Sequence, residues 1–108
     1  MDYRNSLADL TMSTYIVLMK LSENGVKNVK NAPARIERTI RDFETAGCRL
    51  LDFYVLMGPY DFFCVVEGPS DAAIASFALQ VSASGNVKTS LLKAYSREQF
   101  AEMVQNLP

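Results

Sequence analysis

Histidine is absent from this chain of 108 residues. Its absence removes the commonest general base of enzymes and the commonest protein ligand of metals and haem. The chain also has only two cysteines, Cys48 and Cys64, which are too few to complete a zinc site by themselves. We therefore expect neither a metal site nor a bound cofactor.

The chain also lacks an excess of positive charge and a long apolar run. Eleven basic and twelve acidic residues give a net charge of −1, without a dense basic stripe. Binding to nucleic acid is disfavoured, because neutralising phosphates takes clustered cations. The longest apolar run, YIVLM, is far shorter than the roughly 20 residues that cross a bilayer. Residues 1–11 hold no apolar segment typical of a secretory signal, so we expect a cytoplasmic protein without a nucleic-acid or membrane partner.

The patterns that are present alternate between two periods. Apolar and β-branched runs predict strands, and apolar residues at helical spacing predict helices. Strands are expected at 14–21, 48–57, 60–68 and 86–96, and helices at 33–47, 70–85 and 97–107. Residues 22–33 predict a loop with room for one helical turn. The chain then divides into an N-terminal arm at 1–13, one domain at 14–96, and a C-terminal helix at 97–108 that packs on the domain or on a partner.

The order β-α-β-β-α-β predicts an α+β, ferredoxin-like fold, in which a four-stranded antiparallel sheet carries both helices on one face. The other face of such a sheet is normally polar. Here, however, both sides of the strands are apolar: Val17 and Met19 alternate with Ile16 and Leu18 in the first strand. An exposed face of this kind would promote aggregation. We therefore expect a second copy to cover it in a homodimer or a larger assembly, while the alternation leaves open which side faces the helices.

The two cysteines lie on neighbouring strands of a predicted hairpin. If the chain turns at Gly58 and Pro59, Cys64 lies opposite Phe53, about five residues from Cys48. That separation is about 16 Å at ~3.3 Å per residue, which is too far for a disulfide. Both cysteines are expected to be small buried apolar residues.

The segment GPYD at 58–61 has two compatible interpretations. In the first it is a structural turn, in which Gly58 takes a positive φ and Asp61 accepts a hydrogen bond from a nearby backbone N–H. In the second, Tyr60 and Asp61 present a hydroxyl and a carboxylate to a ligand, because a rigid turn is a suitable place for binding groups.

Other polar and aromatic residues allow a structural or a functional reading. Arg35 is either part of a solvated helix face or the partner of an anionic ligand or of Asp61. Tyr54 is either an aromatic of the core or interface or a wall of a ligand pocket. Lys20 and Glu67 fall within apolar strands, and a buried charge needs a partner, so we predict for each a structural ion pair within the chain or across the dimer.

Several separated blocks resemble the GYD-domain family over about residues 14–95: YIVLMKL, GVKNVK with the P-x-R that ends at Arg35, GPYDFFCVVEGPSD and GNVKTSLLKAY. Gly58, Tyr60 and Asp61 supply the motif for which that family is named, and Pro59 fills its variable position. The resemblance implies the dimeric α+β-barrel fold and little chemistry. The chain is similar, more loosely, to the ligand-sensing half of feast/famine regulators. It lacks their helix-turn-helix half, so this likeness implies at most a stand-alone sensing module.

Three functions remain open on these grounds. The first is a small-molecule-binding dimer with Tyr60 and Asp61 as its polar groups, and with Tyr54 and Arg35 as further ligand-binding candidates. The second is a cofactor-independent enzyme, such as a monooxygenase, decarboxylase or isomerase, in which Asp61 is the catalytic base with its pKa raised by burial. The third is a structural or interaction protein without a ligand.

Overall fold

The computed structural model describes residues 12–108, so the predicted arm lies almost wholly outside the described residues. The elements are β1 (Ser13–Leu21), α2 (Glu23–Lys27), the 3-10 helix η2 (Val29–Asn31), α3 (Ala32–Thr45), β2 (Arg49–Val55), β3 (Phe62–Gly68), α4 (Asp71–Ala83), β4 (Val87–Ala94) and α5 (Arg97–Gln105). The predicted β-α-β-β-α-β order, with an added C-terminal helix, is confirmed. The helical turn allowed for in the first loop is α2.

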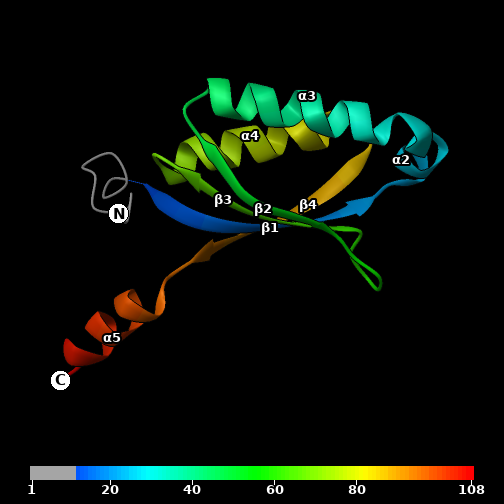
Figure 1. The fold of residues 1–108 in the computed structure, drawn as a ribbon. Coiled ribbons are helices and arrows are strands. Elements are labelled where there is room, and N and C mark those ends of the chain that lie inside the picture. Colours follow the sequence, from blue (N-terminus) through cyan, green and yellow to red (C-terminus); the bar gives the residue numbers. More distant parts are fainter. Residues whose placement is uncertain (1–11) are drawn as a thin grey trace.

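The four strands form one antiparallel sheet in the order β2-β3-β1-β4, and α3 and α4 cover one of its faces (Figure 1). Phe53 lies opposite Cys64, as the predicted hairpin requires. The pairing of β2 with β3 is irregular between Leu50 and Asp52. Because this β-bulge adds a residue, Leu50 and Phe53 both reach the core although simple alternation places them on opposite sides.

The core lies between the helices and the sheet. Its buried cluster consists of Tyr15, Phe43, Cys48, Cys64, Val66 and Ile74, with Val17 and Met19 packed against it. The Tyr15 side of β1 therefore faces the helices. Ile16 and Leu18 lie on the other side, beside Val65 and Phe63 of β3. We call this helix-free surface the open face.

Local signals determine where the helices begin and end. Pro33 lies in the first turn of α3, and Gly47 follows that helix with a φ of 86°. Ser70 caps α4, because its hydroxyl accepts a hydrogen bond from the N–H of Ala73 at 3.1 Å. Gly85 follows α4 with a φ of 83°.

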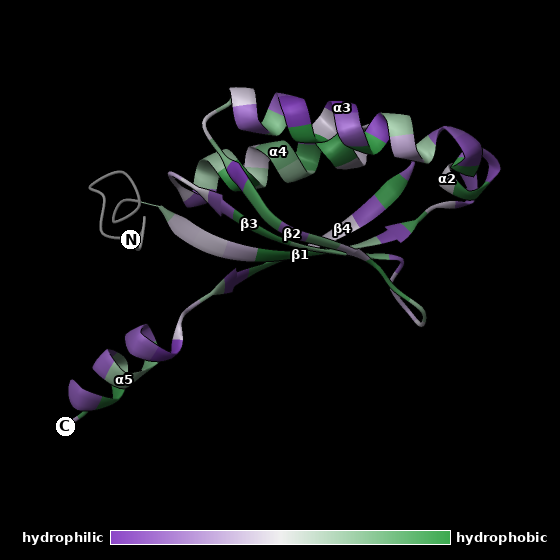
Figure 2. Cartoon of the chain, viewed as in Figure 1, coloured by the Kyte–Doolittle hydropathy of each residue, from purple (hydrophilic) through white to green (hydrophobic). Residues whose placement is uncertain are grey.

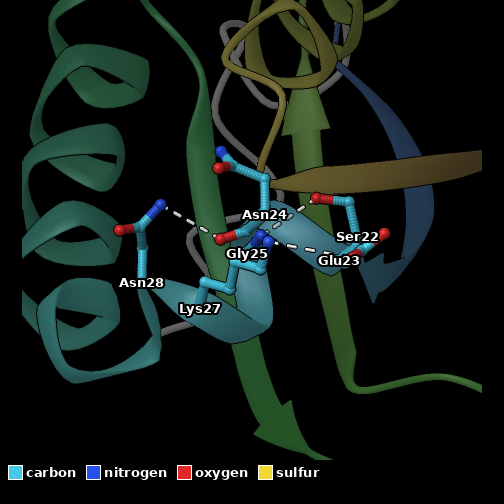
Figure 3. A network of polar contacts seen from close by, with 6 residues as sticks. All are labelled: Ser22, Glu23, Asn24, Gly25, Lys27 and Asn28. Atoms are coloured by element: carbon cyan, nitrogen blue, oxygen red, sulfur yellow. Dashed lines mark hydrogen bonds and ion pairs between the residues drawn. The ribbon is translucent and has the colours of Figure 1, made fainter.

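The short helix α2 is attached to the turn between α4 and β4. Ser22 caps α2 through the N–H of Gly25 (Figure 3), and its own N–H donates to the carbonyl of Asn86 at 2.9 Å. A Cβ on Gly25 would lie 2.0 Å from the oxygen of that same carbonyl. Only glycine fits such a close backbone approach. Residues 85–87 (GNV) therefore form the turn between α4 and β4 and also hold α2 in place.

The C-terminal helix α5 extends away from the sheet, on the side opposite α3 and α4 (Figure 1). All its residues are exposed, including the apolar Phe100 at 63%. In the structure α5 therefore does not pack on the domain of its own chain. Its packing on a partner stays a prediction. Apolar surface is also exposed on α4, which is mostly pale to green in Figure 2 and has Leu79 71% exposed.

Candidate functional site

The hairpin at Gly58 has the predicted turn conformation. Gly58 has a φ of 119°, which confirms the expected positive value. The N–H of Leu56 donates to the carbonyl of Asp61 at 2.8 Å and closes the loop. The neighbouring Met57 is fully exposed at the tip.

Asp61 joins this hairpin to β1 by two hydrogen bonds. Its N–H donates to the carbonyl of Met19 at 2.9 Å, and its Oδ2 accepts from the N–H of Leu21 at 2.8 Å. The carboxylate therefore has the hydrogen-bonding role of the turn interpretation, with the donor on the adjacent strand. Between these positions, the exposed Lys20 donates to the carbonyl of Pro59 at 3.2 Å. Lys20 forms no ion pair with another residue of 12–108, and the alternative of an ion pair across the dimer stays a prediction.

The four candidate binding residues are distributed over three parts of the molecule. Tyr60 and Asp61 are half-buried at the hairpin. Tyr54 is 57% exposed on the open face, where its ring centroid lies 6.4 Å from that of Phe63. Arg35 lies on α3 and lines a cavity between the helices and the sheet. A binding role for Tyr54, Tyr60 and Asp61 stays a prediction.

The cavity that Arg35 lines has a volume of about 230 Å³. Its walls come from α3, α4 and the inner face of the sheet, and most of the lining side chains are apolar, including Met19, Ile40 and Phe77. The two helices meet through Phe43 and Phe77, whose ring centroids lie 4.8 Å apart in an edge-on contact. Sequence periodicity identified these apolar positions but not the space between them, because that space depends on how far apart two separate helices settle.

Glu67 is buried in β3 and forms the predicted ion pair. Its Oε2 lies 3.0 Å from Nη2 of Arg49 on β2, directly across the strand pair. Cross-strand pairs of opposite charge stabilise a sheet at this spacing. This pair is consistent with a structural role.

A second polar cluster was not predicted and joins three elements. The hydroxyl of the buried Tyr15 donates a hydrogen bond to the carboxylate of Asp71 at the start of α4, and Nζ of Lys93 on β4 lies 3.0 Å from the same carboxylate. Burial, and then the bond to Asp71, raises the pKa of Tyr15. The hydrogen bond from Tyr15, and then that from Lys93, lowers the pKa of Asp71. Sequence reasoning missed this cluster, because the side of the last strand on which Lys93 lies became known only when the structure paired Lys93 with Tyr15.

Residues 12–108 contain no candidate metal cluster and no candidate membrane-spanning helix. Among them no group of three or more cysteine, aspartate and glutamate side chains is placed to hold a metal ion. Nor does any helix in this range have the length and apolar content needed to cross a membrane.

Known proteins resemble the chain in sequence and in fold. The GYD domain family matches residues 15–104, which includes most of α5, although the blocks identified in the sequence end at about residue 95. A Thermus thermophilus protein named glutamine synthetase and cystathionine beta-lyase binding protein is 37% identical over 84 residues, covering 77% of this chain and 88% of that protein.

The crystal structure of MtbAldR shares the fold, with a TM-score of 0.64 at 15% identity over 85% of this chain. At this low identity the likeness concerns the fold alone, and the chain spans 58% of the MtbAldR chain. The family match across most of the chain, together with the 37% identity to the Thermus thermophilus protein, makes this chain a member of the GYD domain family.

Proposed function

We propose that this chain is a protein-interaction module that binds a glutamine synthetase or a cystathionine β-lyase. The observation that carries the proposal is the 37% identity to a protein named for binding these two enzymes. Because the match covers 88% of that relative, most of the relative's sequence has a counterpart here. This similarity favours the interaction hypothesis over a small-molecule sensor or a cofactor-independent enzyme.

The surface of α5 supports the proposal. Phe100, Met103 and Val104 of α5 are exposed at the spacing i, i+3 and i+4, and the exposed Leu107 follows just after the helix ends at Gln105. This spacing is the pattern by which an amphipathic helix lays its apolar side into a groove of a partner. Large apolar and aromatic side chains also contribute most to binding energy at protein interfaces. We therefore assign enzyme binding to α5.

The open face serves a different purpose in this proposal, namely association with a second copy. Ile16, Leu18, Phe63 and Val65 are only half-buried there, although their neighbours on the other side of the sheet form the core. A like surface on a second chain would cover them, because an isologous dimer pairs a patch with itself. The exposed Leu92 of β4 extends the same surface.

The experiment measures binding of the full chain to purified glutamine synthetase and, separately, to purified cystathionine β-lyase by calorimetry. Wild-type protein is expected to bind at least one of the enzymes with micromolar or tighter affinity. Phe100→Asp is expected to weaken that binding about tenfold or more, because truncating an aromatic anchor at an interface commonly costs over ~1.4 kcal/mol.

Gln105→Asp is the matched control, since it adds the same charge to α5 outside the apolar stripe. It should leave binding within about twofold of wild type. No binding of either enzyme by the wild-type chain would refute the proposed function. Equal loss in the two variants would refute the role of the apolar side of α5.

A further inference from the structure

The cavity between α3, α4 and the sheet is too large to be a packing defect of an ordinary core. Protein interiors are packed as densely as organic crystals, with few voids larger than a water molecule. The cavity has about 230 Å³. An engineered apolar cavity of about 150 Å³ in another protein stays dry and binds benzene. A cavity of this size therefore accommodates an apolar group at least as large as one aromatic ring.

The lining of the cavity is polarised along its length. One end is mostly apolar, where Phe43 and Phe77 contact each other next to the buried Ile74. At the other end, Arg35 and Asn86 line the cavity, and both are attached to the α2 region. Arg35 donates to the carbonyl of Asn28 at 3.4 Å, and the side-chain oxygen of Asn86 accepts from Asn24 at 3.2 Å.

The two charged residues of the lining determine where in the cavity a charged group of a ligand is favoured. Arg35 and Asp42 are the charged residues that line the cavity within the described part of the chain. Asp42 directly precedes Phe43, so it lies at the Phe43 end of the cavity. It is seven residues along α3 from Arg35. An anionic group would be attracted to the Arg35 end and repelled from the Asp42 end. Guanidinium groups also match carboxylates in geometry, because they can form two parallel hydrogen bonds.

We propose that this cavity binds a small monocarboxylic acid whose apolar body is about the size of one aromatic ring. The apolar body lies between Met19, Ile40 and Phe77, and the carboxylate lies at Arg35 and Asn86. This site is separate from the hairpin at Tyr60 and Asp61, neither of which lines the cavity. The proposal goes beyond the binding of enzymes by α5 and does not depend on it.

The first experiment locates the site by NMR of protein with ¹³C-labelled methionine methyl groups. The probe is 3-phenylpropionate, added to the full chain. Met19 lines the cavity, whereas Met57 is fully exposed at the hairpin tip. The Met19 signal is expected to shift in a saturable way while the Met57 signal stays in place. No shift of Met19 at millimolar probe, or an equal shift of Met57, would overturn the proposal.

The second experiment tests the carboxylate subsite by substituting two arginines of α3, one at a time: the half-exposed Arg35 and the exposed Arg38. Arg35→Gln is expected to weaken binding of 3-phenylpropionate about tenfold, because a charge-assisted hydrogen bond is lost. Binding of the neutral 3-phenylpropan-1-ol should be unchanged. Arg38→Gln is the matched control, since Arg38 lies on α3 outside the cavity. Equal losses in the two variants would show general charge attraction and would contradict the assigned subsite.

The third experiment fills the cavity from α4. Ala78 lines the cavity, whereas the adjacent Leu79 points outward and is 71% exposed. Ala78→Phe is expected to abolish binding of both probes, and Leu79→Phe should bind them as wild type does. Ala78→Leu replaces the larger variant if that variant does not fold. Unchanged binding in a folded Ala78 variant would refute the cavity as the site.

Discussion

The backbone N–H of Leu21 donates a hydrogen bond to Oδ2 of Asp61 at 2.8 Å. The N–H of Asp61 in turn donates to the carbonyl of Met19 at 2.9 Å, so the two residues are joined on both sides of Lys20. Buried or half-buried backbone donors need such partners. An aspartate after the Gly-Pro turn therefore holds the hairpin against the end of β1.

This relationship predicts how substitutions of Asp61 affect stability. Asp61→Ala removes the acceptor of the Leu21 N–H and should lower the free energy of unfolding by about 1–2 kcal/mol. Asp61→Asn keeps an oxygen acceptor and should cost less than half as much. Urea denaturation measures both, with Glu37→Ala on the exposed side of α3 as a control. An Asn variant as unstable as the Ala variant would contradict the hydrogen-bond explanation.

A second prediction concerns the backbone at Gly58. Its φ of 119° is a conformation that residues with a side chain rarely adopt, and an added Cβ would meet no atom within 4 Å. Gly58→Val should therefore lower the free energy of unfolding by about 1–3 kcal/mol through backbone strain alone. Met57→Val, at the fully exposed neighbouring position, should be nearly neutral. Equal effects of the two substitutions on thermal melts would argue against strain at Gly58.

A third prediction concerns self-association through the open face. Sedimentation equilibrium of the wild-type chain should give twice the 12.0 kDa chain mass or a multiple of it. Leu18→Glu places a charge at the centre of the open face and should shift the protein to monomer, because burying an unpaired carboxylate is costly. Leu79→Glu makes the same change on α4 and should leave the mass unchanged. A wild-type monomer would refute the proposed dimer.

A fourth prediction concerns the acid sensitivity of the contact between Tyr15 and Asp71. The fold lowers the pKa of Asp71, chiefly through the hydrogen bond from Tyr15. The ionised carboxylate therefore contributes stability above its unfolded pKa of about 3.9, and this contribution is lost as the pH falls through the lowered folded value. Wild type should melt above Asp71→Asn at pH 7, and the difference should vanish near pH 2.

The contribution of Tyr15 to stability has the opposite pH dependence, because it is lost at high pH. Burial and the bond to Asp71 raise the pKa of Tyr15 above its ordinary value of 10.0, so its contribution is lost as the pH rises through that raised value. Tyr15→Phe should remove the alkaline-dependent contribution of Tyr15 and reduce the acid-dependent contribution of Asp71, which keeps its ion pair with Lys93. A difference between wild type and Asp71→Asn that is equal at pH 7 and pH 2 would contradict the assignment.

The sequence by itself determined the order and type of the elements and much of their local detail. The positive φ of Gly58 and the glycines after α3 and α4 follow from local backbone sterics, which a few neighbouring residues decide. The pairing of Phe53 with Cys64 follows from the position of the turn, since a hairpin's register is set locally. Of the candidate binding residues, these local rules could place Tyr60 and Asp61 at the turn.

Only the tertiary structure decided which side of the sheet faces the helices. Both sides of β1 are apolar, so alternation could not distinguish Val17 from Leu18, and the bulge after Leu50 further altered the alternation in β2. The choice depends on where α3 and α4 pack, which involves residues far apart in the sequence. The same reason applies to the cavity at Arg35. Its volume is set by the spacing of two helices that meet through Phe43 and Phe77, and no local pattern encodes that spacing.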